Sequence, residues 1–168
     1  MKNVKLVLII VITYILQTII VPDFNILGVA PNLLLVVVCG LAFLFGSSTG
    51  GSVGFAAGLL FDLNQGRAIG LYAFLCMYIG MILGQFNKRF FKDNYIVAIT
   101  FTGVATLVYE LIIYIFGAFV YSQSFGFANF ITNILLSVLV NVVASVIVYP
   151  ILLKINIGVE IDRNIFER

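Results

Sequence analysis

Two acids lie inside long apolar stretches of this 168-residue chain, Asp62 and Glu110. An ionised carboxylate in a low-dielectric interior needs a counter-charge, hydrogen-bond donors or a proton. Each of these acids therefore either fixes the structure through hydrogen bonds or takes part in binding or transport. The sequence leaves both roles open for both residues.

The neighbours of the two acids indicate how each is held. Asp62 ends a glycine-rich apolar run, so in a structural role we expect Asn64, Arg67 or water to anchor it. Glu110 stands near the middle of another apolar run, with no Lys or Arg at the same depth. Three polar residues share its helical face: Thr102, Thr106 and Tyr114. We expect Glu110 to be protonated or hydrogen-bonded to Tyr, Thr or Asn neighbours.

The residue inventory argues against catalysis. The chain contains no histidine, which excludes histidine metal sites, Ser–His catalysis and the known types of intramembrane serine and zinc protease. An intramembrane aspartyl protease needs two facing aspartates, and only Asp62 is available. The glycine-rich stretch 46–54 is not followed by the lysine of a phosphate-binding loop. We therefore expect no enzymatic activity, no metal ion and no cofactor.

Small residues recur at every fourth position around Asp62. The stripe comprises Gly46, Gly50, Gly54, Gly58, Asp62 and Gly66. Glycine destabilises a water-soluble helix by about 1 kcal/mol relative to alanine, whereas in a bilayer this spacing lets helix backbones approach closely. A second, shorter face carries Gly80 and Gly84. We expect five of these glycines to pack helices together or to face a partner: Gly50, Gly54, Gly58, Gly80 and Gly84.

The elements that position these residues are expected to be membrane-spanning helices. The chain is 62% hydrophobic and 10% charged, against about 25% charged residues in a soluble domain. Its net charge of +2 is too small to indicate nucleic-acid binding. The composition predicts an all-α polytopic membrane protein with one integral domain over residues 1–168. Six segments are expected to cross the bilayer: residues 4–21, 32–45, 48–63, 70–86, 95–120 and 128–153.

The basic residues predict the orientation. With six crossings, eight of the nine Lys and Arg residues fall on one side and Arg67 stands alone on the other. The positive-inside rule then places both termini in the cytoplasm. The first segment is expected to be a retained span, because its apolar run is longer than that of a usual signal peptide. The loop residues Lys88, Arg89 and Lys92 either anchor this orientation or dock anionic lipid or a cytoplasmic partner.

The last segment carries a polar side chain at every fourth position. The stripe consists of Asn129, Asn133, Ser137, Asn141, Ser145 and Tyr149. Hydrogen bonds between helices from such groups contribute about 0.6–2 kcal/mol each in membranes. The stripe predicts a packing seam against another span, with a polar cavity or a partner-facing groove as alternatives.

Several local motifs follow one another in an order that resembles a known bacterial family. Residues 30–35 read Ala-Pro-Asn-Leu-Leu-Leu, and residues 53–63 read Val-Gly-Phe-Ala-Ala-Gly-Leu-Leu-Phe-Asp-Leu. Gly-Leu-Tyr-Ala at 70–73, the basic loop Lys-Arg-Phe-Phe at 88–91 and Tyr-Glu-Leu at 109–111 follow. Together these motifs resemble MreD, the rod shape-determining membrane protein, over essentially the whole chain.

The resemblance implies a non-enzymatic component of the cell-elongation machinery in the bacterial inner membrane. MreD proteins are expected to contact MreC, to work with MreB, RodA and a class B penicillin-binding protein, and to help organise lateral peptidoglycan synthesis. The family fold is expected to be similar to the substrate-binding component of energy-coupling-factor vitamin transporters. The family often has Pro-Asp where Pro31-Asn32 stands here, and often a basic residue where Phe45 stands. Roles that depend on charge at these positions are not transferred to this chain.

The alternative function is that of a vitamin-binding transporter subunit, which has comparable length and helix number. It would need a pocket near the outer side, to which Asp62, Asn64, Arg67 and Tyr72 would contribute polar groups. The absence of Trp and His and of a polar outer loop argues against it. A channel or proton-coupled carrier working through Glu110 would lack a second intramembrane charge.

Overall fold

The computed structural model describes residues 2–19, 21–23, 28–65, 70–86, 95–121 and 127–166. This part of the chain forms six α-helices and one short 3-10 helix, so the expected all-helical class and helix number are confirmed. The elements are α1 (Lys2–Ile19), η1 (Val21–Asp23), α2 (Leu33–Phe45), α3 (Ser47–Gln65), α4 (Leu71–Gln85), α5 (Tyr95–Tyr121) and α6 (Phe127–Phe166).

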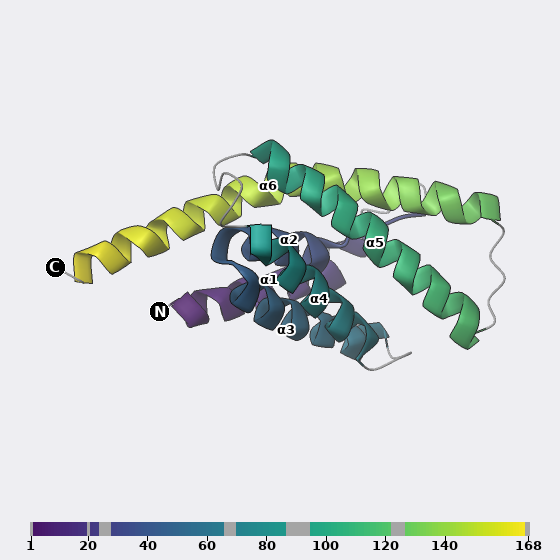
Figure 1. Ribbon diagram of the computed structural model, residues 1–168, viewed down its shortest axis with the longest axis horizontal. Helices are drawn as coiled ribbons and strands as arrows, with labels where there is room; N and C mark the ends of the chain where they lie inside the picture. Colours follow the sequence, from purple (N-terminus) through teal and green to yellow (C-terminus); the bar gives the residue numbers. More distant parts are fainter. Residues whose placement is uncertain are drawn as a thin grey trace.

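Helix α2 lies at the centre of the bundle (Figure 1). Every residue from Leu34 to Leu44 is buried, and α2 packs against all five other α-helices. A helix that is apolar on every side has no face to present to water and belongs in a core. The uninterrupted apolar run at 33–45 thus becomes the element around which the other helices are arranged.

A single residue, Gly46, joins α2 to α3. Its φ of +89° lies in the left-handed region that favours glycine. Its N–H donates a hydrogen bond to the Ala42 carbonyl at 2.9 Å, and its carbonyl accepts one from the Gly50 N–H at 2.8 Å. The chain therefore reverses within one residue, and α3 returns along α2 as a tight helical hairpin.

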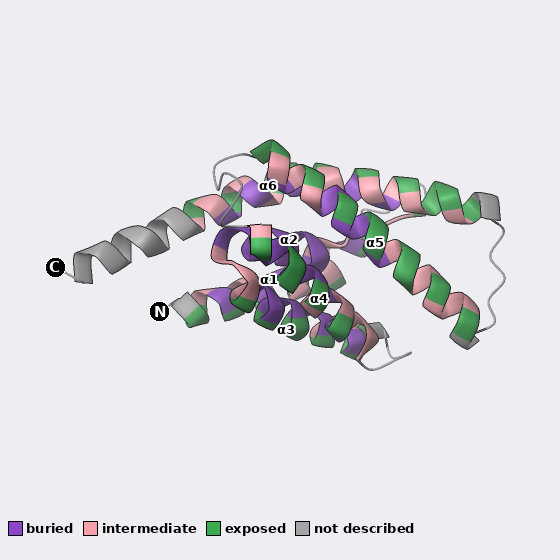
Figure 2. Ribbon diagram, in the orientation of Figure 1, coloured by how far each residue is buried: buried purple, intermediate pink, exposed green. Residues whose placement is uncertain are grey.

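Helices α5 and α6 form an antiparallel pair that reaches beyond the other four helices at the end where α5 stops and α6 starts (Figure 1). Their outer halves are mainly exposed or partly exposed, whereas α2 is almost entirely buried (Figure 2). α6 also continues to Phe166 instead of ending near residue 153. Pro150 lies inside it, where a proline removes one backbone hydrogen bond and its ring clashes with the carbonyl four residues earlier, yet α6 continues past this residue.

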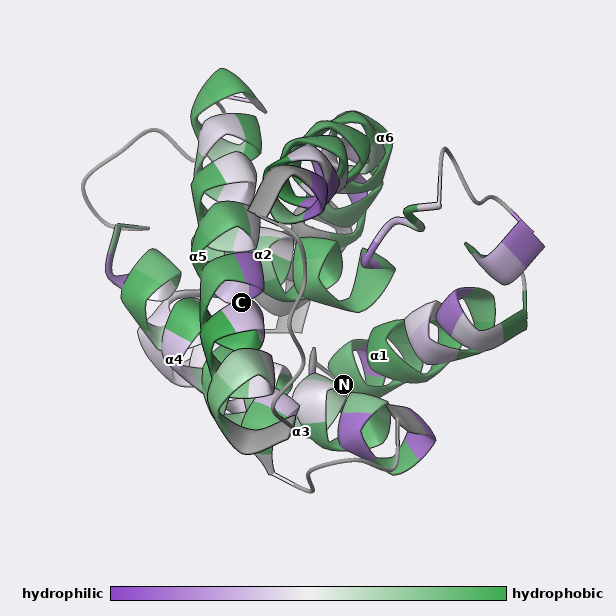
Figure 3. Cartoon of the chain, turned by 90° about the vertical axis from the view of Figure 1, so that its right-hand side faces the viewer, coloured by the Kyte–Doolittle hydropathy of each residue, from purple (hydrophilic) through white to green (hydrophobic). Residues whose placement is uncertain are grey.

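Three helical segments of the described part are long and apolar enough to cross a membrane: Asn3–Asp23, Tyr95–Phe119 and Asn129–Ile155. Helices α2 and α4 are shorter apolar helices. Hydrophobic residues dominate the ribbons of α5 and α6 (Figure 3). The start of α1 and the C-terminal end of α6 lie at the same end of the molecule (Figure 1). Six crossings with cytoplasmic termini stay a prediction.

Candidate functional site

The five glycines expected at helix contacts all lie in the contact between α3 and α4. A Cβ at Gly54 would overlap the Cys76 carbonyl, and one at Gly58 would overlap the Tyr72 carbonyl. Gly50 and Gly80 face each other, so a Cβ on either would meet the backbone of the other. A Cβ at Gly84 would meet the backbone of Ser47. All five glycines are buried, and their missing side chains bring the two backbones into direct contact.

Asp62 caps the N-terminus of α4 from the neighbouring helix. Its side chain is 1% exposed, and its carboxylate accepts three backbone hydrogen bonds. The donors are the N–H groups of Gly70 at 3.0 Å, Tyr72 at 3.1 Å and Ala73 at 3.0 Å. These amides belong to the first turn of α4 and have no carbonyl partner within that helix. A carboxylate at a helix N-terminus is also favoured by the helix dipole.

This geometry identifies anchors of Asp62 that the sequence did not predict. We expected Asn64, Arg67 or water, but the groups that hold the carboxylate are backbone amides of α4. Asn64 is exposed, and Arg67 lies outside the described residues. Asp62 therefore joins the end of α3 to the beginning of α4, at the opposite end of the hairpin from Gly50 and Gly80.

The N-terminus of α2 is capped by three side chains from three parts of the chain. Asn32 Oδ1 accepts a hydrogen bond from the Leu35 N–H at 3.0 Å. Gln17 Oε1 of α1 accepts one from the Leu33 N–H at 2.7 Å. Asn141 Oδ1 of α6 accepts one from the Asn32 N–H at 2.7 Å. The beginning of α2 is thus held by its own N-cap and by two neighbouring helices.

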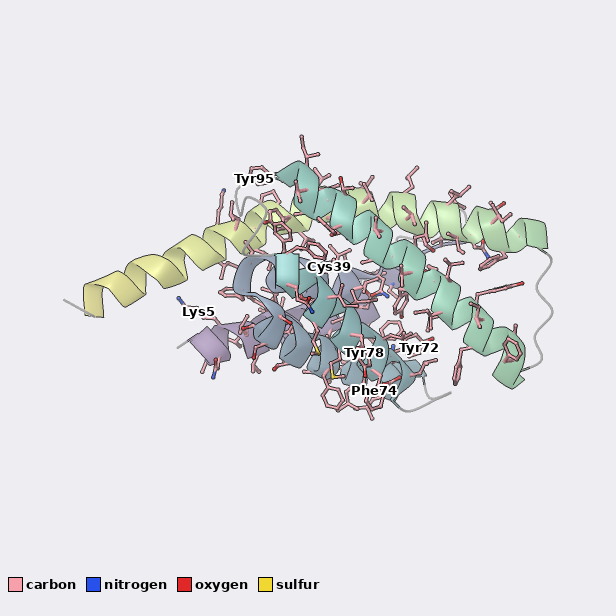
Figure 4. The ribbon with its side chains drawn as sticks, viewed as in Figure 1. Lys5, Cys39, Tyr72, Phe74, Tyr78 and Tyr95 are labelled. Atoms are coloured by element: carbon pink, nitrogen blue, oxygen red, sulfur yellow. The ribbon has the colours of Figure 1, made fainter. Side chains whose placement is uncertain are left out.

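The same cluster extends to α5. Asn141 Nδ2 donates to Thr106 Oγ1 at 3.3 Å, and Thr106 Oγ1 donates to the Thr102 carbonyl at 2.9 Å. Tyr109 of α5 also hydrogen-bonds with the side chain of Asn32. Side-chain hydrogen bonds therefore tie α5 and α6 to the N-terminus of α2. The rings of Tyr72 (labelled in Figure 4) and Tyr109, 6.0 Å apart, place α4 beside α5.

Glu110 lies one helical turn beyond Thr106 on α5. Its side chain is partly buried and is hydrogen-bonded to Ser137 of α6. We had expected a Tyr, Thr or Asn partner and not a serine. The described basic residues lie at the other end of α6 or near the start of α1: Lys2, Lys5, Lys154 and Arg163. Lys5 is labelled at that end in Figure 4.

The polar stripe of α6 divides into two parts. Ser137, Asn141, Ser145 and Tyr149 are buried, with exposed fractions of 8%, 2%, 2% and 3%. Asn129 and Asn133, nearer the beginning of the helix, are exposed. The stripe is therefore a packing seam over part of its length, and its outer part is open.

The remaining candidate residues do not form a further cluster in the described part of the chain. Cys39 and Cys76 are free and buried. Among the described residues, no three His, Cys, Asp or Glu side chains are grouped as metal ligands would be. The basic loop residues Lys88, Arg89 and Lys92 lie outside the described residues. The site therefore consists of the capped helix ends and the α5–α6 seam.

The family model of the rod shape-determining protein MreD matches residues 1–156. The chain belongs to the MreD family. The match covers α1 to α5 and most of α6, and it includes every motif that carried the resemblance. The family resemblance expected from the sequence is thus confirmed, and with it a role in rod-shape determination.

No curated protein and no solved structure matches the chain. The expected similarity to the substrate-binding component of vitamin transporters therefore stays a prediction. Within this MreD-family chain, the structure does explain one departure from the family pattern. Asn32 serves as the N-cap of α2, a position at which Asn and Asp are about equally effective. The substitution preserves the capping acceptor without a charge.

Sequence reasoning missed the capping role of Gln17. The available signal was the one amide side chain in the mainly apolar segment 4–21. Such a residue in a membrane helix usually hydrogen-bonds to a neighbouring helix. Gln17 does so through the Leu33 N–H of α2, and its Nε2 also donates to the Pro31 carbonyl just before that helix at 3.1 Å.

Proposed function

We propose that this chain is a non-enzymatic scaffold of the bacterial elongation machinery. It would lie in the inner membrane with both termini in the cytoplasm and organise lateral peptidoglycan synthesis. MreC would be its direct partner, and MreB, RodA and a class B penicillin-binding protein would be members of the same complex. The observation that carries the proposal is the match of the MreD family model to residues 1–156.

The internal hydrogen bonding supports a scaffold rather than a catalyst. In the part of the chain that the structure describes, no buried side-chain nitrogen or oxygen lacks a hydrogen-bond partner. The buried polar groups fix helix ends and helix contacts, as Asp62 and Asn141 do. Fully satisfied polar clusters of this kind make a core rigid. A rigid core suits a protein that holds partners in fixed positions.

The exposed faces indicate where partners would bind. The glycines of α3 and α4 are occupied by the contact between those helices, so a partner would use other surfaces. α1 and the α5–α6 pair expose many large apolar side chains, among them Val7, Ile12, Val104, Ile115, Leu135 and Leu139. In a bilayer such faces contact lipid or other membrane helices.

The proposal is tested by complementation in a rod-shaped bacterium that lacks its own MreD. We expect the chain to restore rod shape, measured as the length-to-width ratio of the cells, and to co-purify with MreC from the membrane. Mass spectrometry of the purified protein tests the transporter alternative in the same preparation. A stoichiometrically bound vitamin, without MreC and without recovery of cell shape, would overturn the proposal.

A further inference from the structure

The polar seam between α5 and α6 continues beyond the point where α2 covers it. Thr106 of α5 pairs with Asn141 of α6, and one helical turn farther Glu110 pairs with Ser137. Still farther, the rings of Tyr114 and Phe130 stack with centroids 3.5 Å apart. The two helices are thus in antiparallel register over several turns.

Helix α2 begins at one layer of this seam and covers the part of it that runs toward Tyr149. The Asn32 N–H donates to Asn141 Oδ1 at 2.7 Å, and α2 runs away from this layer toward Phe45. Ser137 lies one turn beyond the layer on α6, and Asn133 lies two turns beyond it. Exposure rises along this direction, from 2% at Asn141 and 8% at Ser137 to an exposed Asn133.

These groups lie within the apolar spans and not at their ends. Asn133 is four residues inside the span Asn129–Ile155, which corresponds to about 6 Å at a rise of 1.5 Å per residue. Glu110 is nine residues from the end of the span Tyr95–Phe119, or about 14 Å. A partly exposed glutamate and an exposed asparagine at such depths are unfavourable against lipid.

We propose that Glu110 and Asn133, which lie beside and beyond the buried Ser137 and are together called the outer seam, form a docking surface for a transmembrane helix of another protein. That helix would bring a basic or amide hydrogen-bond donor to the depth of Glu110, on the α5–α6 face that α2 leaves open. The occupant is a helix that carries a donor, because its donor would complement the acid Glu110. Among the described residues, no basic residue of this chain lies at the depth of Glu110. The inference rests on the proposed scaffold role and specifies the surface used.

Photo-crosslinking in living cells tests this inference with the full-length chain. A photoreactive amino acid is placed at Asn133, and a matched control is placed at Leu139 of the same helix, which is 59% exposed. Crosslinked peptides are mapped by mass spectrometry. We expect the Asn133 product to contain a membrane-spanning segment of another protein with Lys, Arg, Asn or Gln within one helical turn of the crosslink.

A substitution at Glu110 then tests the role of the acid. We expect Glu110→Leu to lower the Asn133 crosslink yield by about threefold to thirtyfold, the value of one interhelical hydrogen bond in a membrane. The yield at Leu139 and the amount of protein in the membrane should not change. If Glu110→Leu fails to accumulate, the donor in the mapped partner segment is replaced by Leu, and the same loss is expected.

Four results would overturn the inference: crosslinks to lipid alone, to a second copy of this chain, to a segment without a donor, or a yield that neither substitution lowers. Each is separable from failure of the scaffold role. If the scaffold role itself were wrong, the unsubstituted chain would not restore rod shape. A chain that restores rod shape but gives one of these four results refutes only the outer seam.

Discussion

Asp62 and Glu110 have the same chemistry in the sequence, yet the structure gives them different environments. Asp62 is 1% exposed and accepts three backbone hydrogen bonds from α4, so its acceptor capacity is used within the chain. Glu110 is partly exposed and hydrogen-bonded to Ser137. The first acid fixes a helix end, and the second stays partly exposed on the α5–α6 seam.

Removal of the Asp62 carboxylate should destabilise the fold. Asp62→Ala leaves the first-turn amides of α4 buried without an acceptor, which costs about 1–3 kcal/mol for each unsatisfied group. Asp62→Asn keeps one acceptor oxygen, so we expect an intermediate effect. Both are measured by thermal unfolding in detergent with a thiol-reactive dye that reports exposure of the buried Cys39 and Cys76.

The control for this measurement is Asn64→Ala, because Asn64 is exposed on the same helix. We expect its unfolding temperature to match that of the unsubstituted protein. An Asp62→Ala variant as stable as the Asn64→Ala control would show that the carboxylate does not cap α4 in the membrane protein.

A single methyl group at Gly54 should separate α3 from α4. In Gly54→Ala the new Cβ would overlap the Cys76 carbonyl, and overpacking of this kind costs about 1–3 kcal/mol. Gly117→Ala is the matched control, since a Cβ at Gly117 meets nothing within 4 Å. In the same thermal assay, we expect a lower unfolding temperature for Gly54→Ala only. Equal unfolding temperatures for the two variants would refute the close contact.

At the scale of elements, α2 depends on other helices for its N-terminal cap. It has 13 residues, and it is partly buried at its beginning, at Asn32 and Leu33. Buried N-terminal amides need acceptors. Gln17, Asn32 and Asn141 supply them from three separate segments, which couples the position of α2 to α1 and α6.

Substitutions of Asn32 should show that the cap needs a hydrogen-bond acceptor and not a particular charge. We expect Asn32→Asp to unfold at a temperature close to that of the unsubstituted protein, because both side chains are good N-caps. Asn32→Ala should lose about 0.5–2 kcal/mol. Thermal unfolding by the thiol-dye assay measures both. An Asn32→Asp variant as unstable as Asn32→Ala would contradict the capping interpretation of the family difference.

Asn141→Ala extends this test to α6. It removes the acceptor of the Asn32 N–H and the donor to Thr106 at once, so we expect a clear loss of thermal stability. Asn133→Ala is the control on the same stripe, and its exposed side chain predicts little effect. Equal losses for the two variants would show that the outer and inner parts of the stripe do not differ in role.

At the scale of the whole molecule, the chain ends and the helix directions define a polarity. The start of α1 and the C-terminal part of α6 lie at one end, and the end of α5 and the start of α6 lie at the other (Figure 1). The described basic residues gather toward the first end. In a membrane, this arrangement favours a cytoplasmic position for that end by the positive-inside rule.

Reporter fusions test this orientation. We expect a fusion after Phe166 to be active with a cytoplasmic reporter such as a fluorescent protein and inactive with alkaline phosphatase, which requires the periplasm. A fusion within residues 122–126 should give the opposite result. Phosphatase activity at the C-terminal end would refute the predicted topology.

The sequence was sufficient for the elements and the family. The apolar runs and their glycine and proline boundaries predict six helices, because a bilayer requires long apolar segments with internally satisfied backbones. The run at 53–63 and the Gly-Leu-Tyr-Ala that follows were specific enough to indicate MreD. The four-residue spacing identified the glycines as contact residues but not the helix that they contact.

The partners of Gln17 and Asn141 were decided by tertiary structure alone. The spacing of a polar stripe fixes which face of a helix it occupies, and this holds for Asn133 and Asn141 alike. Whether such a residue is buried depends on which helix covers that face and where that helix ends. α2 begins at the layer of Asn141, so one asparagine became a cap and the other stayed open. Such contacts join residues far apart in the chain, and no local pattern encodes them.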